Sequence, residues 1–325
     1  MSNTITIGVD HGYAAMKTAR FTFPAGLVEY EHEPYTQKNV LEYGGRYFVV
    51  GSGRQPLQRD KTRTEDYYLL TLAAIAKELE YRGAERSAAV HLAAGLPLTS
   101  FGRDKKKFRD YLLRKGELVS FRYDGVDYAV TIPEVSLFPQ GYAAVLTQTE
   151  LLDEPSVIVA DIGGWTVDLM RLDNRIPNAA TCRSLELGMI RCVDEIAEQV
   201  RRLFGVSMTA VQIESILRGE PGSMDDRIRA VIHAQADKYI QALLSAITES
   251  GLDARAMPAV FLGGGAALMK RHIPATEGLC RPLILDDVSL NAKGYERLVG
   301  QLSRGTPPKP SEAGSAGRGG ARERA

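Results

Sequence analysis

The sequence predicts an α/β protein with two domains, each built on a mixed sheet, and a ligand site in the cleft between them. Three observations support this fold class. One pattern occurs at residues 5–17 and again at 157–168: an apolar β-rich run ends in Asp, glycine follows, and a second β-rich run returns. Strand-like and helix-like segments alternate in both halves of the chain. A glycine triplet at 263–265 separates a short apolar strand from a helix.

In the first half, turn residues divide the chain into short strands and helices. The first copy of the pattern predicts a hairpin over residues 4–22, and Gly44-Gly45 and Asp124-Gly125 are typical of turns between strands. Apolar residues at helical spacing predict amphipathic helices between these strands. The segments expected are helices from Thr64 to about Arg82, Thr99 to Leu113 and Pro139 to Leu152, a buried strand from Ala88 to Leu96, and a hairpin from Glu117 to Ile132.

The second half begins with the second copy of the pattern. Asp173-Asn174 is expected to turn its return strand into another strand. From Ser303 the composition changes to Gly, Pro, Ser, Ala and Arg, which predicts a disordered tail. The further segments expected are strands near 180–185, 259–262 and 282–285, and helices over 188–204, 209–217, 225–250, 290–302 and from 266. The predicted domains are therefore 1–152 and 153–302, followed by a tail over 303–325.

Length and composition fit a two-domain globular protein. The chain has 325 residues, of which 44% are hydrophobic and 25% charged. Its formal net charge of zero gives no general attraction to nucleic acid or membranes. Three cysteines without C-x-x-C spacing disfavour a disulfide framework or a zinc site and fit a reducing compartment. The chain has no signal-peptide pattern and no apolar run of about 20 residues, so we expect a cytoplasmic protein.

The first copy of the pattern contains Asp10, Gly12 and Lys17. Glycine lets backbone N–H groups approach phosphate oxygens, and a carboxylate beside them suits a hydrated divalent cation. Lys17 lies on the return strand, where its ammonium could reach a β- or γ-phosphate. Taken alone, this copy is equally consistent with an ordinary strand turn and a solvated lysine.

The second copy, Asp161-x-Gly163-Gly164-x-Thr166-x-Asp168, is the stronger indication of a site. A carboxylate at the end of a buried strand is costly unless a cation or hydrogen-bond donors balance it. Thr166 could cap the loop or contact a phosphate, whereas Trp165 fits a packing role better. With both copies in one chain, a phosphate site is the preferred interpretation.

The glycine triplet at 263–265 would let a flat or polar ligand approach the backbone closely. A turn from a strand into a helix can also use glycine for its geometry alone. The triplet gains significance because it is the third such feature along the chain.

Glu134 lies in the segment that links the two halves, shortly before the second copy of the pattern. A carboxylate near a γ-phosphate can act as a general base or orient water. The alternative is a glutamate at a helix start, where the helix dipole favours it.

In this order the motifs resemble those of the actin, Hsp70 and sugar-kinase superfamily over roughly residues 4–300. They are similar to its phosphate-1 loop, first connecting segment, phosphate-2 loop and adenosine loop, followed by its second connecting segment at 291–295. Within the superfamily they resemble most the bacterial actin-like proteins of the ParM/Alp type, which segregate plasmids. The residues that carry this resemblance are Asp10 to Lys17, Pro133-Glu134 with Pro139-Gln140-Gly141-Tyr142, 161–168 and 261–268.

The resemblance implies an actin-like (ribonuclease H-like) two-domain fold with an interdomain cleft for Mg²⁺ and ATP or GTP. It implies that Asp10 and Asp161 hold the metal, and that Glu134 and Asp161 are catalytic. The nucleotide-binding residues that it implies are Asp10, Gly12, Tyr13, Ala14, Lys17, Gly163, Gly164, Trp165, Thr166, Gly263, Gly264 and Gly265. Small hydroxyl or amide residues are usual where Tyr13 and Ala14 stand, so phosphate contacts there would come mostly from the backbone.

The same resemblance implies a function and partners. The protein would be an NTPase that polymerises with itself, and hydrolysis would destabilise the filament. It would act on plasmid DNA through a DNA-binding adaptor, without sequence-specific nucleic-acid binding of its own and without a membrane partner. Two alternatives stay open: a non-polymerising, PilM-like scaffold of a membrane machine, and a small-molecule kinase, for which the sequence offers no acceptor pocket. P-loop and G-x-S-x-G motifs are absent.

Overall fold

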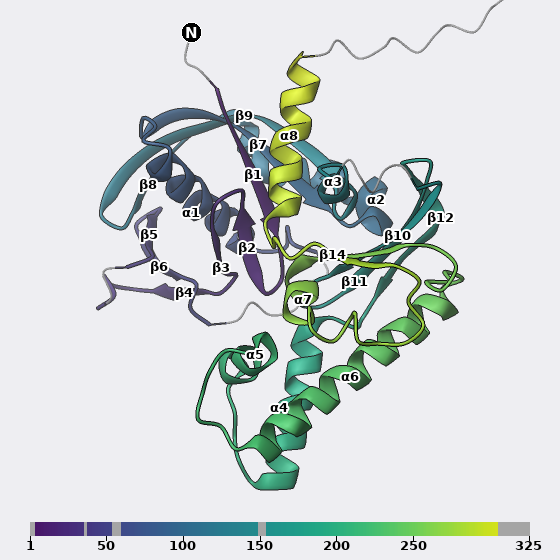
Figure 1. Cartoon of the computed structure of the whole chain (residues 1–325). Coiled ribbons are helices and arrows are strands. Elements are labelled where there is room, and N and C mark those ends of the chain that lie inside the picture. Colours follow the sequence, from purple (N-terminus) through teal and green to yellow (C-terminus); the bar gives the residue numbers. More distant parts are fainter. Residues whose placement is uncertain (1–3, 36–37, 54–59, 149–153, 305–325) are drawn as a thin grey trace, which may run out of the picture.

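Two sheets, one in each half of the chain, form the frame of the molecule in the computed structural model (Figure 1). The structure describes residues 4–35, 38–53, 60–148 and 154–304. The first sheet has the order β3-β2-β1-β7-β9-β8-β5-β6-β4 and the second β12-β11-β10-β13-β14. This α/β architecture confirms the predicted fold class.

The strand bounds follow the predicted turns closely. The first sheet comprises β1 (Ile5–His11), β2 (Ala15–Thr18), β3 (Thr22–Pro24), β4 (Leu27–Tyr30), β5 (Val40–Tyr43), β6 (Arg46–Val50), β7 (Ser87–Leu96), β8 (Leu118–Tyr123) and β9 (Val126–Pro139). The second comprises β10 (Ser156–Ile162), β11 (Val167–Asp173), β12 (Ile176–Leu185), β13 (Ala259–Leu262) and β14 (Pro282–Ile284). The turns at Gly44-Gly45 and Asp124-Gly125 are confirmed, and all four residues adopt positive φ.

Each sheet has a parallel centre and an antiparallel hairpin beside it. β1 runs parallel to β7, and β10 runs parallel to β13. The hairpin partners are β2 and β11, with Asp10 opposite Lys17 and Asp161 opposite Asp168. Ligands of open α/β sheets bind beyond the carboxyl ends of such strands, and both copies of the repeated pattern lie at these ends.

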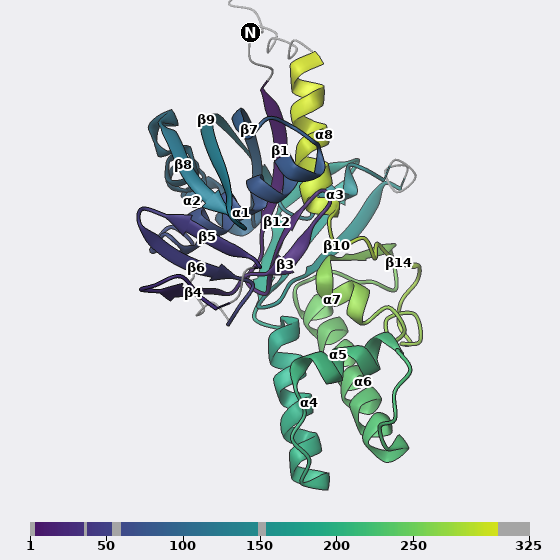
Figure 2. The ribbon, with the colours of Figure 1, turned by 90° about the vertical axis from the view of Figure 1, so that its left-hand side faces the viewer.

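The helices cover the sheets and build the second core. They are α1 (Asp66–Tyr81), α2 (Leu98–Leu113), the short 3₁₀ turn η1 (Arg114–Gly116), α3 (Tyr142–Val145), α4 (Met189–Phe204), α5 (Ala210–Arg218), α6 (Asp226–Glu249), α7 (Gly263–Leu268) and α8 (Leu290–Arg304). Most of α1 is buried against the first sheet, as expected of a helix that is apolar on most of its surface. In both views α4, α5 and α6 lie together at the end of the molecule opposite the N-terminus (Figures 1 and 2).

The last helix returns to the first sheet, where α8 packs against β1 (Figure 1). Glu296 accepts a hydrogen bond from the backbone N–H of Gly8 and forms an ion pair with Arg82. Its neighbour Tyr295 is fully buried. Therefore α8 ties the end of the chain to its first half. The predicted boundary at 152/153 lies outside the described residues, as does the predicted tail from residue 305 onward.

One predicted element differs. The sequence predicts a helix from Pro139 to Leu152, but β9 continues to Pro139 and, of the described residues up to 148, only Tyr142–Val145 are α-helical. The reason is tertiary pairing: residues 134–139 of β9 pair with residues 91–96 of β7. Two smaller differences concern helix bounds. The helix expected from residue 266 begins at Gly263, so the glycine triplet forms its first turn, and α8 includes Ser303 and Arg304 of the predicted tail. Within the described residues, no helix is both long and apolar enough to span a bilayer.

Candidate functional site

A cleft between the two sheets collects most of the residues that the sequence singles out. Its volume is about 770 Å³. Its walls come mainly from the turns after β1 and β10, from α5 and from the first turn of α7. The predicted site residues in its lining are Asp10, Gly12, Tyr13, Ala14, Lys17, Asp161, Gly163, Gly164, Trp165, Thr166, Gly264 and Gly265. The structure thus brings both copies of the repeated pattern to one place.

Asp10, near the end of β1, is buried and held from two sides. Its Oδ2 accepts a hydrogen bond from Nζ of Lys17 at 3.3 Å, and its Oδ1 accepts one from Nε2 of Gln140 at 2.8 Å. Burial alone would raise the pKa of Asp10, but the positive charges of Lys17 and Lys61 and the Gln140 amide outweigh it, so this pKa lies below its usual value. Asp10 is therefore a fixed, ionised carboxylate.

Asp161 occupies the equivalent position, one residue before the end of β10. Its Oδ2 accepts a hydrogen bond from Nδ2 of Asn291 at 2.9 Å. Burial, and after it the negative charge of Asp10, raises the pKa of Asp161. The two carboxylates thus repel each other across the cleft, and a cation between them would relieve that repulsion.

Asp168 adds a third carboxylate to the same wall, because it lies opposite Asp161 in the β10–β11 register. Burial raises the pKa of Asp168 to about 6. Its Oδ1 is buried and has no hydrogen-bond partner within the described residues. A buried, unpaired polar atom costs free energy, so this oxygen is suited to a water molecule or a ligand group in the cleft.

Two glycines fix the shape of the cleft. A Cβ on Gly164 would lie 2.6 Å from Cβ of Ala14, so glycine is what lets the second turn touch the first. Gly263 has φ of +88°, and a Cβ there would lie 2.5 Å from Oδ1 of Asp161. Of the three glycines predicted to contact the nucleoside, Gly264 and Gly265 line the cleft. Gly263 lies behind Asp161, outside the lining.

These contacts predict opposite outcomes for neighbouring substitutions. Gly263→Ala should lower the melting temperature, because its positive φ costs about 1–2 kcal/mol for an L-residue and its methyl group would press on Asp161. Gly264→Ala should leave the melting temperature unchanged or raise it, because nothing lies within 4 Å of its Cβ position and alanine favours helices. Thermal unfolding of both variants compares them, and equal losses would contradict the geometry.

The structure does not bring Glu134 to the cleft. Its side chain is 65% exposed, is absent from the lining and lies 3.6 Å from Nδ1 of His91 on the neighbouring strand. Six residues of extended strand, about 20 Å, separate it from Gln140. The structure therefore places Glu134 outside the cleft where it was expected to act on water, and the reason is the unexpected continuation of β9.

Other lining residues were not among the predicted site residues. Gln140 and Asn291 belong to the connecting segments and bond to the two carboxylates. Lys61, from the loop before α1, had no sequence signal at all. The far end of the cleft is lined by apolar and charged side chains, namely Met189, Val211, Glu214, Arg218, Leu268, Lys270, Asp286 and Val288. The cleft therefore has one end that holds the buried carboxylates, and a far end where apolar side chains stand beside the ion pairs Arg218–Glu214 and Lys270–Asp286.

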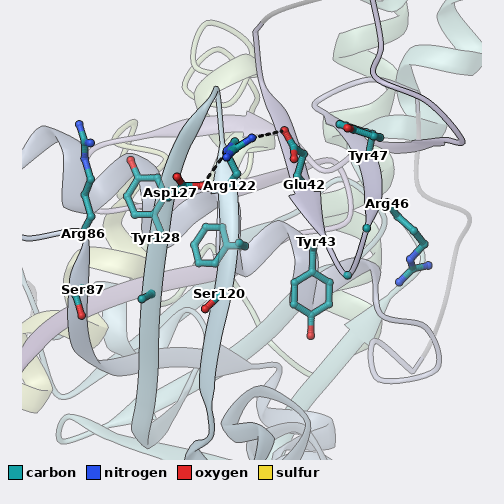
Figure 3. A pocket seen from close by; sticks show the side chains of 14 residues that line it. Glu42, Tyr43, Arg46, Tyr47, Arg86, Ser87, Ser120, Arg122, Asp127 and Tyr128 are labelled. Atoms are coloured by element: carbon teal, nitrogen blue, oxygen red, sulfur yellow. Dashed lines mark hydrogen bonds and ion pairs between the residues drawn. The ribbon is translucent and has the colours of Figure 1, made fainter.

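A second hollow, of about 550 Å³, lies on the first sheet between β5, β8 and β9 (Figure 3). Arg122 crosses it and pairs with Asp127 at 2.8 Å and with Glu42 at 3.6 Å. These charges are solvent-exposed and paired with one another. The charges that cross this hollow are thus already balanced, and the central cleft, with its buried carboxylates, is the better candidate.

Comparison with known proteins agrees with this geometry. Residues 8–142 match the family model described as actin like proteins N terminal domain. No curated protein matches the chain in sequence. The chain has the actin-like fold.

Within that fold, similar solved structures include ParM- and Alp-type proteins and an archaeal actin homolog. The apo psk41 ParM protein is 18% identical, with 93% of this chain and 99% of that chain covered and a TM-score of 0.69. The archaeal actin homolog in complex with ADP is 17% identical, with coverages of 92% and 100% and a TM-score of 0.68. A 15-stranded ParM filament from Clostridium botulinum is 17% identical, with coverages of 92% and 99% and a TM-score of 0.69. The predicted resemblance is confirmed.

Proposed function

We propose that this protein binds and hydrolyses ATP or GTP with Mg²⁺ and assembles into filaments while the triphosphate is bound. The observation that carries the proposal is the equivalent placement of Asp10 and Asp161, which face one cleft from matching hairpins. The ADP complex of the archaeal actin homolog supports the choice of ligand, and the ParM filament supports self-assembly.

The residues present fit a hydrated Mg²⁺. This ion keeps several waters and is usually bound through one or two carboxylates together with substrate phosphates. Within the described residues, no three His, Cys, Asp or Glu side chains form a metal site by themselves. Asp10 and Asp161 would therefore hold the ion's water shell while the nucleotide completes the site. Mg²⁺ would supply positive charge that balances the phosphates. The same charge would stabilise the ionised form of Asp161, whose pKa is raised by burial in the cleft.

The two turns would bind the phosphates. Gly12, Gly163 and Gly164 leave room for backbone N–H donors, and Tyr13, Ala14 and Trp165 would contribute through their backbone. Lys17 and Thr166 add a cation and a hydroxyl group. The nucleoside would lie at the far end, against Gly264 and Gly265.

We assign the attacking water to Asp168 in place of Glu134, and give Gln140 a positioning role. Water adds to the γ-phosphorus, the bond to the bridging oxygen breaks, and the diphosphate leaves with that oxygen. The unpartnered Oδ1 of Asp168 would orient this water and accept its proton. Gln140 would hold Asp10 in position through its amide.

Filament dynamics follow from differential binding. If the triphosphate closes the cleft, it favours the conformation that assembles, and loss of the γ-phosphate removes those contacts. A chain with zero net charge fits DNA transport through an adaptor better than direct DNA binding. Cytoplasmic location, plasmid cargo and the adaptor stay predictions.

Light scattering at ninety degrees tests the proposal. With Mg²⁺ and ATP or GTP, scattering should rise on mixing and decay as phosphate is released, and the protein should pellet during the plateau. The diphosphate should give no plateau, because it lacks the γ-phosphate contacts.

Other outcomes separate the alternatives. Nucleotide binding without scattering at high protein concentration would contradict filament formation and favour the non-polymerising scaffold. Transfer of phosphate to an acceptor other than water would favour a kinase.

A further inference from the structure

Lys61 is a buried cation in the cleft that the proposed hydrolysis does not use. It lies between β6 and α1 and is only 8% exposed. Its Nζ donates a hydrogen bond to the backbone oxygen of His11 and lies 4.9 Å from the ring centre of Tyr13 and 5.6 Å from that of Tyr67. The loop thus delivers an ammonium group to the turn that follows β1.

The ammonium is poorly compensated where it lies. It has three N–H donors, and His11 provides its one hydrogen-bond acceptor within the described residues. Among the residues that the structure describes, no carboxylate forms an ion pair with Lys61, although Asp10 and Asp168 attract it from farther away. Burial lowers the pKa of Lys61 to about 8. The two tyrosine rings offset only part of the free-energy cost of burying this charge. An anion bound beside Lys61 would therefore be stabilised by it.

The neighbouring cation differs in this respect. Lys17 already forms an ion pair with Asp10, and Asp10 and Asp161 raise its pKa despite burial. Of the described lysines and arginines that line the cleft, Lys17, Arg218 and Lys270 form ion pairs and Lys61 does not. Lys61 lies beside Tyr13 and is attracted by the charge of Asp168, whereas residues of α5 and α7 line the far end.

We propose that Lys61 binds the terminal phosphate of a nucleoside triphosphate and makes the cleft discriminate between triphosphate and diphosphate. This inference rests on the proposed function, and it adds a residue whose contact depends on whether the γ-phosphate is present. With the nucleoside at the far end, against Gly264 and Gly265, the terminal phosphate is the group that approaches Lys61. A phosphate oxygen would satisfy N–H donors that His11 leaves unused.

The same loop connects the cleft to the surface. Asp60, next to Lys61, pairs with Lys107 of α2 at 2.5 Å and accepts a hydrogen bond from the hydroxyl of Thr62 at 2.7 Å. The segment that carries Lys61 is therefore tied to α2 by this ion pair.

Calorimetric titration of the full chain with Mg²⁺-ADP and with a non-hydrolysable Mg²⁺-ATP analogue tests the inference. Lys61→Met should weaken the triphosphate analogue by about tenfold or more, since a charge-assisted hydrogen bond contributes about that factor. Binding of ADP should change by less than about threefold, which also shows that the variant is folded. Lys61→Arg should restore part of the difference, and Lys106→Met on the exposed face of α2 is the charge-matched control.

Equal weakening of both nucleotides by Lys61→Met would overturn the inference, as would unchanged affinity for both. If the unaltered chain binds neither nucleotide, the proposed function fails and the inference fails with it. If the unaltered chain binds both and Lys61→Met has no effect, only the inference fails.

Discussion

Asp168→Asn should slow phosphate release by at least about a hundredfold while nucleotide binding persists. The expectation follows from removing a general base, which contributes about 10²–10⁴ in rate. Asparagine keeps the size of the side chain but cannot accept a proton as a carboxylate does. Measured with excess Mg²⁺ and ATP, the variant should therefore form filaments whose scattering plateau lasts far longer.

Glu134→Gln is the matched comparison, because it removes a carboxylate that the structure places outside the cleft. Its phosphate release should stay close to that of the unaltered protein, because an exposed side chain outside the cleft lies away from the reacting groups. The opposite pattern, with Glu134→Gln slow and Asp168→Asn normal, would refute the assignment of the water. Loss of nucleotide binding in Asp168→Asn would instead give Asp168 a binding role.

The sequence predicts the frame of this molecule well because the frame depends on local signals. The Asp–Gly turns, the glycine pair at 44–45 and the helix at α1 all arise from short-range preferences of the backbone or from apolar spacing. The same signals bring Asp10 and Asp161 to the cleft, since a strand's end is defined by its own residues. Matching hairpins then lie at matching places in the two sheets.

The misplacement of Glu134 shows where local reasoning fails. Pro133 and Pro139 lie at the two ends of residues 134–139, and proline is compatible with the start of a helix as well as with a strand. Only the pairing with β7 decides that these residues form a strand. That pairing joins segments about forty residues apart, and no periodicity within the segment encodes it. Once β9 continues, Gln140 rather than Glu134 reaches the carboxylate of Asp10.

Lys61 illustrates a second limit. In the sequence it is one lysine among charged neighbours, which is typical of a solvated loop. Its burial results from packing against Tyr13 and Tyr67, which come from different elements. A buried charge of this kind is visible only after the tertiary contacts are known, and such charges concentrate at functional sites.

Lys61→Met should stabilise the ligand-free protein, which is the reverse of what a structural lysine would do. The usual pKa of 10.5 falls to about 8 on folding, and this difference corresponds to roughly 3 kcal/mol of destabilisation at pH 7. Methionine has similar length and no charge. The melting temperature without nucleotide should therefore rise by several degrees, while the affinity for the triphosphate falls.

The stabilising effect of Lys61→Met should depend on pH, and the pKa of Lys61 gives the direction of that dependence. Below pH 8 the lysine is charged in both folded and unfolded chains, so the whole penalty is present. Between pH 8 and about 10.5 the unfolded chain binds a proton that the folded chain has lost, so stability rises with pH relative to Lys61→Met. The gap in melting temperature between Lys61→Met and the unaltered protein should consequently shrink over this range, whereas Lys106→Met should show no gap at any pH. A gap that stays constant from pH 7 to 10 would mean that the lysine's charge is not what destabilises the empty cleft.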